Sequence, residues 1–289
     1  MSLALGLLLP LSTATAVTAE SCLRHGAPST KSEIIQRVDR VPTFSVVNAQ
    51  CVTAVAAAKR LRGGGLSKDE IIQKLNRVPT FSVVNAEGQV VPMRGEDGEA
   101  DDVCWFTNAA EARELLALTS AAYPEAELRL AVSPLGVVFG LCKGWPPGEA
   151  DEEETEDEGS TYTGGKLKLR APRAVLEATG AGLREQLEAQ GLEPGDWQMP
   201  IYCSDDFQTE AMMPLFFSQD DFAAGWRRAG KPEPPPENLA VMDLRALVKQ
   251  MRDTDVFDWK IFTFVSSEEA YALAQELQER TKAQDEGLE

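Results

Sequence analysis

The sequence predicts an α+β protein made of two pseudo-symmetric halves, each containing a mixed β-sheet flanked by helices. One order of elements occurs twice: a helix, a strand that opens with proline, an apolar strand that ends in aromatic residues, a capped helix and a further strand. Tight turns join some strands and helices join others, which is typical of mixed sheets covered by helices. A chance recurrence is the alternative, because every helix start favours the same capping residues.

The first half is organised around Val78–Asn85, which reads Val-Pro-Thr-Phe-Ser-Val-Val-Asn. Its β-branched and aromatic residues predict a strand. Pro79 lacks an N–H group, so it is expected at the beginning of that strand or on a sheet edge. A degenerate version, Met-Pro-Ile-Tyr-Cys-Ser, stands at Met199–Ser204. We therefore expect Pro200 to be the counterpart of Pro79 in the second half.

The other elements follow from apolar spacing and from capping residues. For the first half we expect helices at 67–75 and 109–122 and strands at 89–93, 103–106, 127–132, 135–142 and 166–169. For the second half we expect helices at 172–190, 218–226, 245–252 and 266–281 and strands at 199–204, 212–217, 239–244 and 259–265. The pairs expected to open helices are Ser67 with Glu70, Asn108 with Glu111, Ser218 with Asp221 and Ser266 with Glu269. The shared order makes Trp105-Phe106 the expected counterpart of Phe216-Phe217, and Ala131-Val132 that of Ala240-Val241.

Residues 1–66 are expected to form a targeting segment of low order. An apolar run at Leu3–Leu11 precedes Ala14-Thr15-Ala16, which resembles a signal-peptide cleavage site, and the following residues are rich in Ser, Thr, Ala and Arg. This combination predicts a bipartite plastid address; the alternative is an N-terminus that is disordered or wrongly predicted from the gene. Within it, residues 31–50 repeat 68–87 without a gap, which indicates a recent duplication or an exon counted twice.

Residues 67–280 are expected to form one α+β domain, followed by a polar tail at 281–289. An insert at 148–160 contains eight acidic side chains and no basic one. Like charges this dense predict a disordered loop. A calcium site is the alternative, but the insert lacks the glycine and the ligand spacing of an EF-hand loop.

The chain is strongly acidic, with 28 basic and 46 acidic residues and a net charge of −18. Residues 1–66 carry seven basic and three acidic side chains, a net +4, so the remainder carries −22. Such a body repels nucleic acid and anionic lipid headgroups and attracts cationic partners. At physiological salt the attraction extends about 8 Å, so it favours encounter more than tight binding.

The sequence contains no set of residues that requires an enzyme, a cofactor or a metal. The single histidine, His25, lies in the expected targeting segment, so no histidine remains for a catalytic triad or a metal site. The glycine clusters lack the spacing of a phosphate-binding loop. The adjacent acids Asp205-Asp206 and Asp220-Asp221 are interpreted as helix-start residues. Five cysteines form no C-x-x-C pair and are interpreted as free thiols, with Cys104, Cys142 and Cys203 lying in apolar runs.

Aromatic residues at strand ends are the candidate binding residues. A sheet covered on one face only would leave some of them lining grooves that could hold extended client peptides. The six candidates are Phe81, Trp105, Phe106, Phe216, Phe217 and Trp226. Core packing is the alternative for each of them.

Four motifs resemble one known family. They are Val78-Pro79-x-Phe81-x-Val83, the step from Phe106-Thr107 to Glu111-Ala112, Met199-Pro200-Ile201-Tyr202, and Pro214-Leu215-Phe216-Phe217-Ser218-Gln219-Asp220-Asp221. Their order and spacing resemble the twenty-two-kilodalton subunit family of the translocon at the inner envelope membrane of chloroplasts. The resemblance covers about Ser67 to Gln278. The chain departs from the family pattern in the duplicated Val41–Asn48 and in the acidic insert.

The resemblance implies a non-enzymatic, soluble plastid protein of the envelope intermembrane space that assists protein import. It implies a chaperone or tether for preproteins that is peripheral rather than integral to the membrane. The implied partners are plastid preproteins, their transit peptides and translocon subunits. Transit peptides are basic and poor in acids, so an acidic carrier would attract them. The alternative is a scaffold or assembly module of the plastid or thylakoid lumen that has no role in import.

Overall fold

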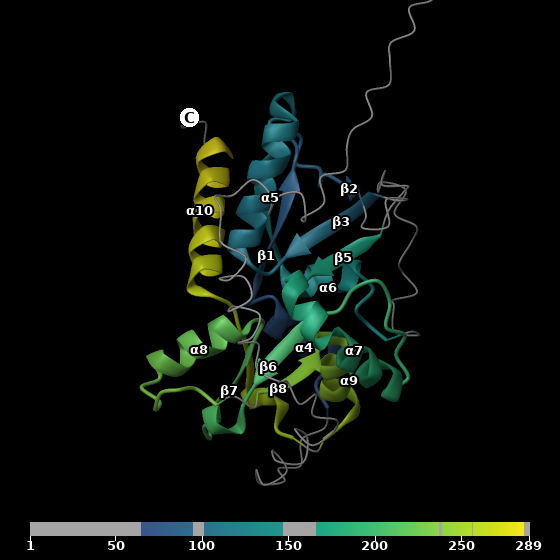
Figure 1. Cartoon of the computed structure of the whole chain (residues 1–289), viewed down its shortest axis with the longest axis vertical. Coiled ribbons are helices and arrows are strands. Elements are labelled where there is room, and N and C mark those ends of the chain that lie inside the picture. The colour runs from purple at the N-terminus through teal and green to yellow at the C-terminus, as the bar shows by residue number, and fades with distance from the viewer. Residues whose placement is uncertain (1–64, 95–100, 147–165, 237–238, 256, 286–289) are drawn as a thin grey trace, which may run out of the picture.

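Two β-sheets lie one above the other along the long axis of the molecule (Figure 1). The computed structural model describes residues 65–94, 101–146, 166–236, 239–255 and 257–285. The predicted targeting segment, apart from its last two residues, and the predicted acidic insert lie outside the described residues. The expected polar tail is described as far as Asp285, where the last helix ends.

The first sheet has the strand order β4-β1-β3-β5. Its strands are β1 (Pro79–Val84), β3 (Asp101–Phe106), β4 (Arg129–Pro134) and β5 (Leu167–Arg170). β1 is antiparallel to both of its neighbours, and β5 runs parallel to β3. A short strand, β2 (Met93–Arg94), pairs with the beginning of β3. In β1, Phe81 lies opposite both Phe106 and Val132.

The second sheet repeats this topology as β8-β6-β7-β9. Its strands are β6 (Pro200–Cys203), β7 (Met213–Phe216), β8 (Ala240–Asp243) and β9 (Phe262–Val265). β6 is antiparallel to both neighbours, and β9 runs parallel to β7. Tyr202 lies opposite both Phe216 and Val241, as Phe81 does in the first sheet. The predicted α+β fold in two similar halves is therefore confirmed.

The two registers decide which residues correspond. Because Phe81 and Tyr202 are equivalent, Pro79 corresponds to Pro200 and Ala131-Val132 to Ala240-Val241, as predicted. The predicted match of Trp105-Phe106 with Phe216-Phe217 is wrong by one residue. Phe106 is equivalent to Phe216, so Trp105 is equivalent to Leu215.

The helices that follow the last strand of each half are exchanged between the two sheets. α10 (Glu268–Asp285) follows β9 of the second sheet but packs with α5 (Ala109–Ala122) on the first sheet, where the two helices lie side by side (Figure 1). α7 (Arg173–Ala189) follows β5 of the first sheet but packs on β6 and β8, beside the cluster formed by α8 (Gln219–Arg228). Each half therefore completes the core of the other.

The opposite faces of both sheets share one central core. Helices α4 (Lys68–Leu75), α6 (Leu135–Leu141) and α9 (Leu244–Asp253) contribute to it. α6 and α9 begin in equivalent ways: Leu135 N–H donates to the carbonyl of Val78 at 3.0 Å, and Leu244 N–H donates to that of Met199 at 2.9 Å. The first half and the second half are thus joined through apolar packing at the centre of the molecule.

The predicted strand at 135–142 is instead helix α6. Its buried residues Leu135, Val138, Phe139 and Cys142 follow helical spacing and face the central core. An apolar run of this length can form either a strand or a buried helix, so its composition alone could not decide. Pro134 ends β4 and stands at the start of the helix, where a missing N–H group has no cost.

Other boundaries differ by smaller amounts. Residues 259–261, predicted as strand, form the 3₁₀ turn η4 (Trp259–Ile261) before β9. Of the predicted returning strand at 89–93, Val90 pairs with Val84 as an isolated bridge and Met93 begins β2. Ser267, not Ser266, accepts the first-turn hydrogen bond of α10, from Ala270 N–H at 3.0 Å. The predicted capping box of Ser67 and Glu70 is present in both directions.

Candidate apolar binding site

All six aromatic candidates are buried. Phe81 and Phe106 lie in the cluster beneath α5 and α10. Phe216 lies in the matching cluster beneath α8, and Trp226 is the residue of α8 that packs into it. Trp105 and Phe217 belong to the central core. The most exposed of the six, Phe106, exposes 7% of its surface. Binding of a client to these residues remains a prediction, and it would require the clusters to open.

The structure instead contains a small apolar hollow between the second sheet and α9. β6, β7, β8 and β9 contribute to its floor, and the segment before β9 contributes aromatic walls. The lining residues are Ile201, Cys203, Met213, Leu215, Met242, Leu247, Gln250, Phe257, Trp259 and Phe262. None of the six aromatic candidates is among them. The volume of about 30 Å³ has room for about two water molecules, so a side chain of a client could enter only if a wall moved.

The chemistry of this hollow suits apolar groups. Gln250, Trp259 and the weakly polar Cys203 thiol are the lining residues with hydrogen-bonding groups, the indole N–H of Trp259 donates to the carbonyl of Thr254, and none of the ten residues is charged. Such a surface gains free energy by removing apolar groups from water and has little capacity to select among them. The hollow is therefore suited to binding varied apolar side chains rather than to catalysis.

The two halves differ at the position that forms the floor of the hollow. Leu215 lines it, whereas the equivalent residue of the first half is Trp105, whose larger indole is buried in the central core. By the same register, Cys203 corresponds to Ser82 and Met242 to Ser133. The hollow thus lies where the second half has a smaller floor residue and more apolar neighbours.

The aromatic wall is held by its own contacts. The Nε1–H group of Trp259 donates to the carbonyl of Thr254 at 2.9 Å. Its ring lies 5.0 Å from that of Phe257 and 4.8 Å from that of Phe262, measured between ring centroids. Each of the three rings packs against the other two, so they form one continuous aromatic wall.

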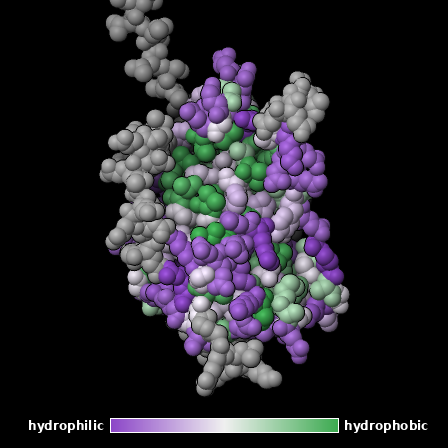
Figure 2. All heavy atoms as spheres, turned by 180° about the vertical axis from the view of Figure 1, so that it is seen from behind, coloured by the Kyte–Doolittle hydropathy of each residue, from purple (hydrophilic) through white to green (hydrophobic). Residues whose placement is uncertain are grey.

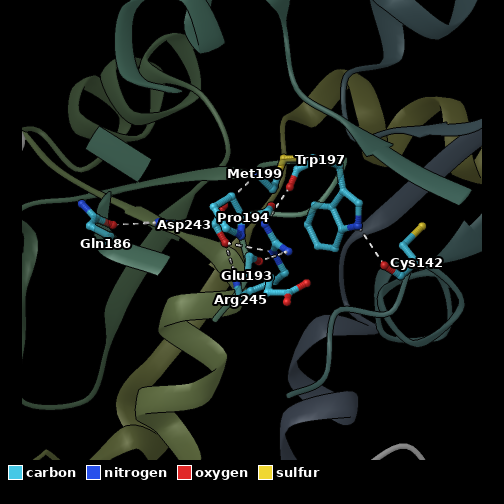
Figure 3. A network of polar contacts seen from close by, with 8 residues as sticks. All are labelled: Cys142, Gln186, Glu193, Pro194, Trp197, Met199, Asp243 and Arg245. Atoms are coloured by element: carbon cyan, nitrogen blue, oxygen red, sulfur yellow. Dashed lines mark hydrogen bonds and ion pairs between the residues drawn. The ribbon is translucent and has the colours of Figure 1, made fainter. Parts of the chain in front are cut away.

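The other wall, α9, is fixed by a buried polar network (Figure 3). Asp243 caps the helix: its carboxylate accepts the N–H groups of Arg245 at 2.8 Å and Met199 at 3.2 Å. The guanidinium of Arg245 donates to the carbonyls of Glu193, Pro194 and Trp197, at 3.2 Å for the first and 2.8 Å for the last. The network therefore ties α9 to β6 and to the loop that precedes it.

The network also includes residues from both halves of the molecule. Gln186 of α7 accepts the N–H of Asp243 at 3.1 Å, and its amide donates to the carbonyl of Val241 at 2.8 Å. On the other side, Trp197 Nε1–H donates to the carbonyl of Cys142 at 2.8 Å, and its ring stacks under Arg245 (Figure 3). This network was not predicted, although Trp197, two residues before Met199, and the Asp243–Arg245 pair are visible in the sequence.

The electrostatics of the network are those of a structural element. Burial raises the pKa of Asp243, and the charge of Arg245 together with three backbone N–H groups opposes this shift. Burial likewise lowers the pKa of Arg245, while Asp243 opposes it. The carboxylate oxygens are occupied by cap hydrogen bonds, so Asp243 is not available as a general base for a substrate.

The remaining chemistry-bearing groups form no metal or nucleophile site within the described residues. No group of three or more His, Cys, Asp or Glu side chains there could hold a metal ion. Cys104 and Cys142 are buried free thiols, and burial raises the pKa of both. Reactive thiols require the opposite shift.

Apolar residues also reach the surface. On the face opposite that of Figure 1 they gather in an upper and a lower area, with a band of hydrophilic residues between them (Figure 2). Among the most exposed apolar side chains are Val137 and Leu141, one turn apart on α6. None of the described helices combines the length and apolar character of a membrane span.

The sequence matches no family profile and no curated protein. Among solved structures it is similar to Tic22 of Anabaena, which is described as a protein of protein transport. The identity is 16% and the TM-score 0.46, and the match covers 73% of this chain and 98% of the Anabaena chain. It is also similar to Tic22 from Plasmodium falciparum, with 16% identity and a TM-score of 0.47; the match covers 72% of this chain and 97% of the Plasmodium chain. Both carry the name of the family that the four motifs resemble. An identity this low does not transfer a function.

Proposed function

We propose that this protein is a non-enzymatic component of plastid protein import that acts as a chaperone or tether for unfolded preproteins. The observation that carries the proposal is the uncharged apolar hollow beside a wall of three aromatic rings, in a strongly acidic chain. The four import-family motifs in the sequence support the import role. We further propose a location in the envelope intermembrane space, peripheral to the membrane, with preproteins and translocon subunits as partners.

The affinity that such a carrier needs is modest. Micromolar binding corresponds to about −8 kcal/mol. Burying one apolar client side chain contributes roughly 2 kcal/mol, so about four such contacts, in the hollow and in neighbouring apolar areas, are needed before ordering costs are included. Because the hollow is small, the proposal includes movement of the Trp259 wall when a client enters.

The charge of the chain adds selectivity for transit peptides. These peptides are basic and poor in acids, and the chain outside residues 1–66 carries −22. Surface charges are screened within about 8 Å at physiological salt, so they speed encounter rather than hold the client. Salt should therefore weaken binding without abolishing it.

The proposal is tested by fluorescence anisotropy with the full chain, a labelled transit peptide and a labelled unfolded preprotein, at low and high salt. We expect micromolar binding that weakens at high salt and persists. Met242→Ser gives the hollow the residue of the first half and should weaken binding about fivefold, since it removes about 1 kcal/mol of apolar contact. Val137→Ser, at an exposed apolar position on α6 outside the hollow, is the matched control.

Absence of binding to either ligand at both salt concentrations would reject the carrier function and favour a scaffold of the plastid or thylakoid lumen. Equal affinities for wild type, Met242→Ser and Val137→Ser would leave a carrier whose site is elsewhere. Copurification distinguishes the two functions independently: a carrier brings preproteins and translocon subunits, whereas a scaffold brings one fixed complex.

A further inference from the structure

A second, polar hollow lies on the other side of the Trp259–Phe262 segment. It is lined by Leu66, Glu70, Gln73, Lys74, Arg77 and Lys260, and its volume of about 200 Å³ greatly exceeds that of the apolar hollow. Five of its lining residues come from α4 and the turns that flank it, and Lys260 comes from η4. Neither the fold nor the proposed carrier function accounts for it.

Three cations converge on this hollow. Lys74 is half-buried, and its ammonium donates to the carbonyl of Lys260 at 3.0 Å and to that of Phe262 at 2.8 Å. An ammonium has three donors, so one proton of Lys74 remains for a ligand. Arg77 and Lys260 have exposed side chains, and neither forms an ion pair with the rest of the described chain.

The two acids nearby are engaged elsewhere. The Glu70 carboxylate accepts the N–H of Ser67 at 2.9 Å and its hydroxyl at 3.0 Å, as the capping box of α4. The Asp258 carboxylate accepts the N–H of Lys260 at 3.1 Å, as the cap of η4. Counting all five groups, the hollow keeps a local charge of +1 in a chain whose net charge is −18.

The electrostatic environment of Lys74 agrees with a shortage of negative charge. Burial lowers the pKa of Lys74, and the positive charge of Arg77 lowers it further. Asp258 and Glu70 only partly offset these effects. An anion in the hollow would relieve the repulsion between the two cations.

We propose that this polar hollow binds a phosphate group, as inorganic phosphate or as a small phosphate monoester. At neutral pH such a group carries between one and a half and two negative charges and three strong acceptor oxygens. Arg77 supplies a planar pair of donors, and Lys74 and Lys260 supply point charges, which together suit a tetrahedral anion. The amide of Gln73 adds a neutral donor. A carboxylate, with one charge and two oxygens, would use fewer of these donors.

The test is titration of the full chain with inorganic phosphate by calorimetry, with KCl adjusted to keep the ionic strength constant and with acetate as the comparison anion. We expect saturable binding in the millimolar range or tighter, and at least about fivefold weaker binding by Arg77→Gln and by Lys260→Gln, because each loses one charge-assisted contact. The matched controls Arg184→Gln and Lys282→Gln remove exposed charges outside the hollow and should bind like wild type. Hydrogen exchange should slow in residues 73–77 and 258–262 when phosphate is bound.

Absence of saturation by about 10 mM would overturn the proposal, since the affinity would then be below that of a specific site. Equal binding of acetate and phosphate would also overturn it. So would an equal loss of affinity in the four variants, because the effect would then come from net charge rather than from the hollow. None of these results depends on whether the protein carries preproteins.

Discussion

Replacing Arg245 by Met removes the cation at the centre of the network that holds α9. Met matches the stem of Arg as far as Nε and has no charge, so the packing around the stem is largely kept. The substitution leaves Asp243, which is fully buried, without its counter-charge. It also removes the donors to the carbonyls of Glu193, Pro194 and Trp197.

The expected cost is large. Removing one partner of a buried charge pair destabilises a protein by about 3–5 kcal/mol, because the remaining charge is uncompensated. The contacts to the carbonyls of Glu193 and Pro194 are only partly buried, so water can replace those hydrogen bonds, whereas the contact to the carbonyl of Trp197 is buried and adds to the loss. A loss of about 3–5 kcal/mol is a large fraction of the 5–15 kcal/mol typical of folded proteins. We therefore expect a folded protein with a much lower urea midpoint.

The pH dependence gives the loss a specific signature. Burial already raises the pKa of Asp243, and loss of Arg245 raises it further. Between the ordinary pKa of an aspartate and this higher folded value, the folded state binds more protons than the unfolded state, so stability increases as pH falls. The difference in free energy of unfolding between Arg245→Met and wild type should therefore shrink from pH 7 towards pH 4.

Urea unfolding followed by circular dichroism at pH 7 and at pH 4 measures both quantities. Arg227→Met, at an exposed arginine in the last turn of α8, is the control and should change stability by less than about 0.5 kcal/mol. A loss below about 1 kcal/mol for Arg245→Met, or a difference from wild type that grows on acidification, would refute the reasoning about the buried pair.

Two further predictions concern the floor of the apolar hollow and helix α4. Leu215→Trp, which copies Trp105 of the first half, should fill the apolar hollow and weaken client binding at least about fivefold. Overpacking should cost roughly 1–3 kcal/mol of stability. Anisotropy measures the change in affinity and urea unfolding the change in stability; unchanged client affinity in the folded variant would contradict the prediction. Ser67→Ala removes the capping box of α4 and should cost about 1 kcal/mol in urea unfolding, whereas no measurable change would show that the cap is dispensable.

The duplicated fold was predictable because the sequence features that specify its strands are local. A proline at the first position of β1 and of β6, and β-branched or aromatic residues after it, specify the same strand in both halves. The exchange of α7 and α10 was not predictable, because which sheet a helix covers depends on tertiary packing and not on its own periodicity. The helix at 135–142 was missed because residues on all its sides are apolar.

The candidate site was harder to predict for a physical reason. Reasoning from the sequence selected large aromatic residues in strands, and such residues contribute most when they are buried in the core. The hollow is lined mainly by medium-sized residues and exists where Leu215 replaces the larger Trp105. Aligning the two halves one residue differently would have shown this substitution, but only the observed strand register identifies the correct alignment.

The carrier function is tested most directly by asking which residue touches the client. A photoreactive benzophenone amino acid is placed at Gln250, which lines the apolar hollow, and in a second protein at Gln275, an exposed position on α10. We expect irradiation to join an unfolded preprotein to the Gln250 position, with excess unlabelled transit peptide reducing the yield. Crosslinking that is absent at Gln250, or that is equal at Gln275, would contradict the assignment of the hollow as the client site.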